Sequence, residues 1–204
     1  MTVEAKAARE FCARVSEPGF EPGSLARWLD GLSHAERVAA VRAAGRSEQR
    51  RLYKAVEGFA SLGLADMVPS TTPAGTTVRH HGKNTLPAFT HFEKRFCRPS
   101  GCDSTDPDRL YGFNFQTLAA ITGPGYFVAV PSDQRNEVLV DYRRLPEEQP
   151  ADWPSIRSNE LGLSRFVYGF MVDTLRRVSE HVTIGSAARK GKDLGSWFLL
   201  TRES

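Results

Sequence analysis

YGFNFQTLAAITGPGYFVAVPSDQRNEVLVDY, residues 111–142, is the stretch that decides the fold. Aromatic and β-branched residues, which favour extended chains, fill separate short runs within it. The runs are divided by Gly123-Pro124-Gly125 and Ser132-Asp133-Gln134, which are typical turn sequences. The pattern predicts antiparallel strands over Tyr111–Thr122, Tyr126–Val130 and Glu137–Tyr142.

A hairpin is predicted at the C-terminal end of the sequence. His181–Ala188 and Ser196–Arg202 are joined across Lys190-Gly191-Lys192, whose central glycine suits a left-handed turn position. With this hairpin, we expect an antiparallel sheet of about five strands.

Amphipathic helices are predicted on either side of the aromatic stretch. Residues 86–97 carry Leu86, Phe89, Phe92 and Phe96 at spacings of three and four. Ser164 opens a second segment with apolar residues at helical spacing. Those residues are Phe166, Val167, Phe170, Met171, Leu175 and Val178. We therefore expect one or two helices to pack against the sheet, with a strand as the alternative for the segment from Ser164.

The N-terminal part of the chain is predicted to form short helices. Val3, Ala7, Phe11 and Val15 recur at four-residue spacing, which places them on one face of a first helix. A second helix is expected after Ser24, with Leu25, Trp28, Leu29 and Leu32 on one face. Ser33 and Glu36 have the spacing of a capping box, which predicts the start of a third helix.

A fourth helix is expected between a glycine stop and a polar linker. Gly45 suits the end of the preceding helix and Ser47 an N-cap, and Leu52, Val56 and Phe59 would form an apolar face. Pro, Ser, Thr and Gly are then frequent over 65–77. We interpret residues 1–64 as a helical subdomain, 65–77 as a linker or surface loop, and 78–204 as a β-rich domain. Helices followed by antiparallel strands predict the α+β class.

Composition narrows the class of protein. With 40% hydrophobic and 25% charged residues, the chain resembles a globular protein and not a disordered one. No apolar run approaches the roughly 18 residues of a membrane span, and no secretory signal is recognised, so we expect a cytoplasmic protein without membrane contact. Its odd number of cysteines, 3, indicates reduced thiols.

The polar cluster Arg79-His80-His81-Gly82-Lys83-Asn84 suggests the candidate catalytic residues. Histidine serves as a general base near neutral pH, so His81 and His91 are candidates. Cys97 is a possible nucleophile, because neighbouring basic residues could lower its pKa. The spacing of these residues matches no recognised metal motif, and we predict neither a metal site nor a particular cofactor.

The aromatic residues of the β-rich part favour a small-molecule site. A curved sheet can enclose an apolar cavity, and the bias toward basic residues over 79–98 could supply a basic rim for an anionic group. The predicted ligand-binding residues are Arg79, Lys83, Asn84, Arg95, Tyr111, Asn114, Gln116 and Tyr168. The leading hypothesis is thus a non-catalytic small-molecule-binding or regulatory module, whose ligand would be an apolar or anionic small molecule.

Other hypotheses use other parts of the chain. An enzyme would use His81, His91 or Cys97, with Asn114 or Gln116 orienting the substrate. The helical subdomain could contact a protein partner. Its arginines, together with a net charge of +3, allow a nucleic-acid partner without implying one. Ordinary core packing is an alternative for each aromatic residue, and a solvated helix face for each arginine.

Overall fold

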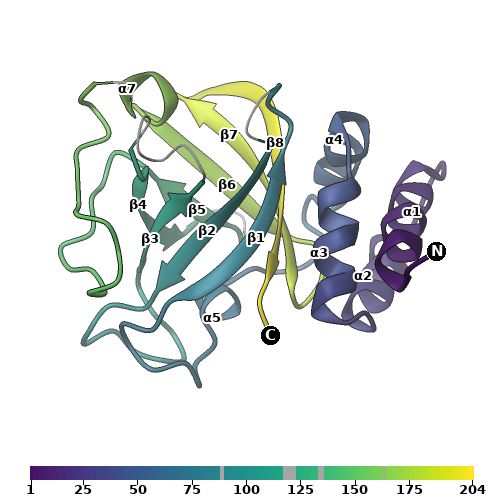
Figure 1. The fold of residues 1–204 in the computed structure, drawn as a ribbon, viewed down its shortest axis with the longest axis horizontal. Helices are drawn as coiled ribbons and strands as arrows, with labels where there is room; N and C mark the ends of the chain where they lie inside the picture. The colour runs from purple at the N-terminus through teal and green to yellow at the C-terminus, as the bar shows by residue number, and fades with distance from the viewer. Residues whose placement is uncertain (88–89, 117–122, 133–135, 163) are drawn as a thin grey trace.

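The chain folds into a closed β-barrel with a group of helices at its side (Figure 1). The computed structural model describes residues 1–87, 90–116, 123–132, 136–162 and 164–204. The strands are β1 Val78–Asn84, β2 His91–Cys97, β3 Leu110–Phe115, β4 Tyr126–Pro131, β5 Val138–Asp141, β6 Met171–Arg177, β7 Val182–Arg189 and β8 Lys192–Arg202. Each strand pairs antiparallel with the next, and β8 pairs with β1 to close the barrel. The α+β class with an antiparallel sheet is confirmed, but eight strands replace the predicted five.

The helix predicted over 86–97 is wrong, because β2 occupies His91–Cys97. Phe92 and Phe96 are four residues apart, and this spacing also fits the two-residue period of a strand. The backbone N–H of Asn84 donates to the carbonyl of Thr90 at 2.8 Å, which ties the end of β1 to the start of β2. Pairing with β1 therefore overrides the helical spacing. Phe89 lies outside the described residues.

The helix predicted from Ser164 is also wrong beyond its first turn. Helix α7 covers only Ser164–Val167, and β6 begins at Met171. Phe170 has a φ of 61°, which a continuing right-handed helix does not allow. Within β6, Met171 and Leu175 lie on the same face as Asp173. Because Asp173 is buried but charged, the inward-facing residues of β6 do not form the apolar alternation that indicates a strand.

The strands predicted in the aromatic stretch and at the C-terminus are confirmed. β3 matches the first run as far as Phe115, and β4 and β5 match the other two within two residues. Residues 117–122 and 133–135 lie outside the described part of the chain. The terminal hairpin turns at Lys190 and Gly191, with φ values of 50° and 74°. Left-handed values at both positions are those of a hairpin turn that follows the twist of its strands.

The N-terminal helices form from the expected signals, with two corrections to their starts. They are α1 Val3–Ser16, α2 Pro22–Asp30, α3 His34–Ala43 and α4 Arg46–Ala55. The capping box of Ser33 and Glu36 is confirmed. Glu21 caps α2 in place of Ser24, and Gly45 is the N-cap of α4 in place of Ser47. Phe59, predicted on the apolar face of α4, lies beyond that helix and is exposed.

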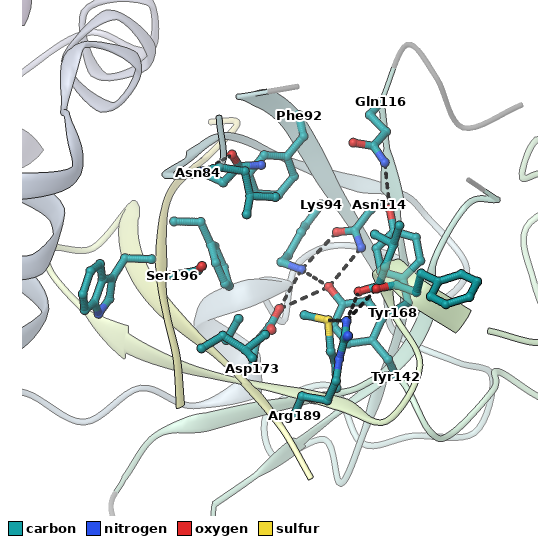
Figure 2. A pocket seen from close by; sticks show the side chains of 18 residues that line it. Asn84, Phe92, Lys94, Asn114, Gln116, Tyr142, Tyr168, Asp173, Arg189 and Ser196 are labelled. Carbon is teal, nitrogen blue, oxygen red and sulfur yellow. Dashed lines mark hydrogen bonds and ion pairs between the residues drawn. The ribbon is translucent and has the colours of Figure 1, made fainter. Parts of the chain in front are cut away.

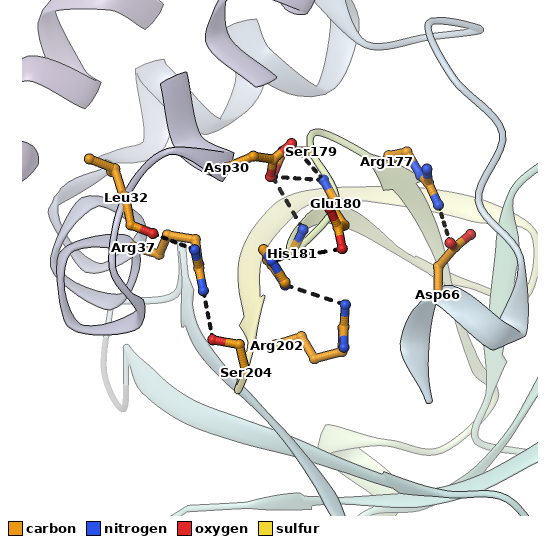
Figure 3. Close-up of polar contacts among 10 residues, drawn as sticks. All are labelled: Asp30, Leu32, Arg37, Asp66, Arg177, Ser179, Glu180, His181, Arg202 and Ser204. Atoms are coloured by element: carbon orange, nitrogen blue, oxygen red, sulfur yellow. Dashed lines mark hydrogen bonds and ion pairs between the residues drawn. The ribbon is translucent and has the colours of Figure 1, made fainter. Parts of the chain in front are cut away.

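The helices pack on the outside of the barrel across the pairing of β1 with β8. Helix α3 contacts β1 and β8, and α4 contacts β7 and β8. Leu52 of α4 and Ile184 of β7 belong to one buried apolar cluster. Polar contacts add to it, since Asp30 accepts from the backbone N–H of Glu180 at 3.0 Å and Arg37 donates to Ser204 at 2.8 Å (Figure 3).

One end of the barrel is plugged by the short helix α5, Leu64–Met67. Leu64, Met67 and Val68 are buried in the apolar cluster that fills the barrel. The imidazole of His80 bonds the carbonyl of Met67 at 2.9 Å, which holds the plug against β1. Any opening to the barrel interior must then lie at the opposite end.

We expect Gly112→Ala to destabilise the barrel. A Cβ at Gly112 would lie 2.3 Å from the Phe127 ring and 2.6 Å from the carbonyl oxygen of Arg95. Because the Arg95 backbone belongs to a paired strand and cannot move aside, the free energy of unfolding should fall by about 2 kcal/mol in urea titrations.

Gly63→Ala is the matched control for this substitution. Its added methyl would meet only a side-chain oxygen of Asp66, at 3.6 Å, and the free energy should stay within about 0.5 kcal/mol of the parent. Equal stability of the Gly112 variant and the parent would contradict tight packing at this position.

Candidate functional site

The open end of the barrel contains a cavity of about 330 Å³ (Figure 2). Its walls come from the mouth-side ends of the strands together with α7, which lies at the same end in Figure 1. Phe92 and Lys94 of β2, Asp173 of β6 and Phe198 of β8 all face inward, because alternate residues of a strand point to the same side of the sheet. The volume is at the lower limit of small-molecule sites.

The rim of the cavity is unusually apolar for an exposed surface. Phe166 is 74% exposed, Leu86 46% and Leu194 44%, and all three line the cavity. They come from α7, from the residues after β1 and from β8. Large apolar side chains that gather around an opening favour a site for an apolar molecule or partner.

A buried polar cluster at the inner wall of the cavity centres on Lys94. Its ammonium nitrogen Nζ lies 3.0 Å from Asn114 Oδ1 and 3.2 Å from Asp173 Oδ2, and it also donates to the Tyr142 hydroxyl. The Tyr142 hydroxyl in turn donates to Asp173 Oδ2 at 3.2 Å and accepts from Asn114 Nδ2 at 2.9 Å. Figure 2 shows these groups converging on one point from separate strands.

Lys94 and Asp173 are an ion pair with little access to solvent. Their side chains are 2% and 3% exposed. The Nζ atom of Lys94 lies 4.8 Å from the ring centre of Phe198, 5.0 Å from that of Tyr142 and 5.1 Å from that of Phe127. Aromatic faces attract a cation, so the rings and the carboxylate together compensate the cost of burying the ammonium group.

Burial weakens the charged state of each ionisable member of the cluster. It lowers the pKa of the Lys94 amine below its ordinary value, and the nearby Asp173 carboxylate opposes this shift. It raises the pKa of Asp173, against the effect of Lys94 and Tyr142. It also raises the pKa of Tyr142, and Asp173 adds to that rise. A proton can thus move between Lys94 and Asp173 at smaller cost than between exposed groups.

One oxygen of the cluster has no partner in the described part of the chain. Asp173 Oδ1 is buried and makes no hydrogen bond there. An unsatisfied carboxylate oxygen costs free energy in a dry site, so such an atom is a candidate contact for a ligand donor.

Tyr168 and Gln116 form a second polar pair in the lining of the cavity. Gln116 Nε2 donates to the Tyr168 hydroxyl at 2.8 Å, and the Tyr168 ring stacks on that of Tyr142 at 5.4 Å. Arg189 donates to the carbonyl oxygens of Phe166 and Val167, at 2.8 and 3.0 Å. These bonds attach α7 to the end of β7 and shape the mouth.

The structure divides the predicted ligand-binding residues into two groups. Asn84, Asn114, Gln116 and Tyr168 line the cavity. The others, Arg79, Lys83, Arg95 and Tyr111, do not line it and occupy strand positions that alternate with inward-facing ones.

Contacts on the outside of the barrel explain where two of the outer residues point. Arg95 stacks on Phe115, 3.9 Å from its ring centre, and pairs with Glu93. Tyr111 is buried on the outer face in a cluster with Trp153. Arg79, Lys83 and Arg95 of the predicted basic rim are therefore on the other side of the barrel wall from the cavity, whereas Lys94, from the same basic stretch, faces the cavity.

The predicted catalytic residues also lie away from the cavity. His81 faces α3, with its ring 5.3 Å from that of His34, and His91 is exposed at the start of β2. Cys97 belongs to the outer cluster, and burial raises the pKa of its thiol to about 12. The expectation that basic neighbours lower this pKa is wrong, because loss of solvation is the largest effect on the thiol.

The predicted ligand-binding and catalytic residues did not include Lys94, Tyr142 and Asp173, which form the centre of the candidate site. A signal for Lys94 is present in the sequence, since it alternates with Phe92 and Phe96 and therefore shares their face in a strand. The mistaken helix over 86–97 placed it on the opposite face. Asp173 was hidden in the same way by the helix predicted from Ser164.

The geometry of the chain defines its structural class, an antiparallel β-barrel with a cavity at one end. No protein-family model matches the chain, and neither the curated proteins nor the solved structures include a match to it. Within the described ranges, no helix is long and apolar enough to span a membrane. The same residues contain no group of three or more His, Cys, Asp or Glu side chains placed to hold a metal ion.

Proposed function

We propose that this protein binds a small, largely apolar molecule in the mouth of the barrel. The observation that carries the proposal is a cavity with an exposed apolar rim at one end and the buried Lys94 cluster at the other. This combination of an apolar wall and a few converging polar groups is typical of small-molecule sites. The proposal does not involve His81, His91 or Cys97, which lie outside the cavity.

The polar cluster defines how the ligand would be oriented. Its apolar body would lie against Phe92, Met171 and Phe198, and its polar end would face Lys94 and Asp173. A hydroxyl group suits this end, because it can donate to Asp173 Oδ1, which accepts no hydrogen bond from the residues that the structure describes. Because the charges of Lys94 and Asp173 cancel, a charged ligand would be buried without a counter-charge, which favours an uncharged ligand.

Filling the cavity is expected to weaken binding. Naphthalenemethanol is a suitable probe, because it joins a flat apolar body to one hydroxyl group. Ala187 lines the cavity, so Ala187→Phe places a ring in the space that the probe would occupy. We expect at least about a tenfold loss of affinity, measured by isothermal titration calorimetry.

The neighbouring residue gives a matched control for this experiment. Ala188 lines a hollow on the outside of the barrel together with Val172 and Thr174, so Ala188→Phe should leave the affinity unchanged. Equal weakening by both substitutions would show that the probe does not bind in the cavity. Native mass spectrometry of the purified protein would add an independent check, since a co-purified organic mass supports the same site.

A further inference from the structure

We infer that Lys94 forms an imine with an aldehyde or ketone bound in the cavity. This inference rests on the proposed binding function and deepens it by naming the reactive group of the ligand. Among the residues that the structure describes, Lys94 is the lysine that lines the cavity. Its Nζ lies among aromatic rings at the inner wall of the cavity. Burial lowers the pKa of this amine against the opposing effect of Asp173, and loss of its proton gives the neutral, nucleophilic form.

Asp173 has the position that imine formation requires of a proton carrier. Its Oδ2 is 3.2 Å from Lys94 Nζ, so it can take a proton from the ammonium group and leave a free amine. The amine nitrogen then forms a bond to the carbonyl carbon, while Asp173 returns the proton to the carbonyl oxygen. The product of this step is a carbinolamine whose nitrogen is still positively charged.

The second half of the reaction uses the same carboxylate. Asp173 takes a proton from the carbinolamine nitrogen and delivers it to the hydroxyl group, which leaves as water as the carbon–nitrogen double bond forms. An ammonium ion and a carbonyl compound thus give a protonated imine and water, with no oxidant or reductant. The imine keeps one positive charge, and Asp173 ends as a carboxylate beside it, which replaces the original ion pair by an equivalent one.

Tyr142 and Asn114 are positioning residues in this scheme. The Tyr142 hydroxyl contacts both Lys94 Nζ and Asp173 Oδ2, and Asn114 contacts Lys94 Nζ at 3.0 Å. They hold the amine and the carboxylate together before and after the reaction. The apolar rings around Lys94 exclude water, which would otherwise hydrolyse the imine.

The test compares naphthaldehyde with naphthalenemethanol, which has the same ring but no carbonyl group. Protein mixed with the aldehyde is reduced with borohydride, which converts an imine into a stable secondary amine. We expect one addition per chain, with the mass of the aldehyde less one oxygen atom, and peptide mapping should place it on Lys94. The alcohol should bind without any covalent addition.

Variants distinguish Lys94 from the exposed lysines. In Lys94→Met/Asp173→Leu, which removes both charges and keeps an apolar interior, the yield of adduct should fall at least about tenfold. Lys192 is exposed on β8, and Lys192→Met should leave the yield unchanged. An adduct on exposed lysines alone, or an equal yield in the double variant, would overturn the inference.

The two probes also separate failure of the imine from failure of the binding function. Binding of the alcohol that Ala187→Phe weakens, without an adduct on Lys94, would leave the proposed function standing and refute the imine. Absence of binding by both probes would overturn both proposals.

Discussion

Lys94→Met is expected to lower the free energy of unfolding by about 3–5 kcal/mol, the cost of breaking a buried ion pair from one side. The substitution leaves the Asp173 carboxylate without its cation. Its Oδ1 already lacks a partner among the described residues, and only the Tyr142 hydroxyl continues to donate to Oδ2. Urea titration at pH 7 measures this loss directly.

The pH dependence of that loss has a definite sign. Burial already raises the pKa of Asp173, and removal of Lys94 raises it further, since Lys94 opposes the rise. A carboxyl group whose pKa is higher in the folded than in the unfolded protein destabilises the fold once the pH exceeds its unfolded pKa. The Lys94→Met penalty should therefore shrink as the pH is lowered from 7 toward 4.

A double variant separates the lost pair from lost packing. In Lys94→Met/Asp173→Leu neither charge remains, and most of the stability should return, because well-packed apolar replacements for a buried ion pair are often neutral. Lys192→Met, at an exposed position, should change the free energy by less than about 0.5 kcal/mol. A loss below about 1 kcal/mol in the single variant would show that the cluster is hydrated and not a dry ion pair.

The second large effect concerns acid and His80. This imidazole is 1% exposed, packs edge-on against Phe96 and donates from Nε2 to the Met67 carbonyl. Burial lowers its pKa to about 3, with smaller contributions from Arg202, His81 and Lys94. The unfolded chain therefore binds a proton near pH 6.5, whereas the folded protein resists it until much lower pH.

The stability that His80 provides is complete above pH 6.5 and is lost as the pH falls toward 3. At about 1.4 kcal/mol per pH unit, the loss between pH 6.5 and 4 is about 3 kcal/mol. In His80→Gln the amide can still donate to the Met67 carbonyl but does not titrate. The difference in unfolding free energy between pH 7 and pH 4 should be about 3 kcal/mol smaller in this variant than in the parent.

His91→Gln is the control for the acid experiment. His91 is exposed at the start of β2, so its smaller burial should give a much smaller change in acid sensitivity. An identical pH dependence of the His80→Gln variant and the parent would mean that the folded protein accepts a proton at His80, against the burial described for it.

Local chemistry explains which parts of the fold were predictable. The capping box of Ser33 and Glu36 and the turn at Gly191 depend on residues a few positions apart, and both are confirmed. Closure of the barrel depends on pairing between His80 and Arg202, which are far apart in the sequence. No pattern within a short window reports such pairing, so the number of strands was underestimated.

The candidate site shows the same limit in another form. Asn114 was predicted as a polar ligand-binding residue within the aromatic β-rich part, and it does line the cavity. Lys94 and Asp173 were missed because charged residues are expected to face solvent, and their mutual pairing across separate strands is what allows them to face inward. A buried ion pair of this kind departs from the hydrophobic pattern on which the prediction of inward-facing residues depends.

The pairing of β1 with β8 also matters for how the protein is made. During translation β1 leaves the ribosome long before β8, and at cellular rates of synthesis it waits on the order of ten seconds for that partner. Throughout this interval one edge of β1 is open to other nascent chains. Arg79 and Lys83 put positive charge on the waiting strand, and charge on an open edge works against pairing with the wrong chain. We therefore expect the charges of Arg79 and Lys83 to disfavour association of the unpaired β1 edge with other chains until the barrel closes.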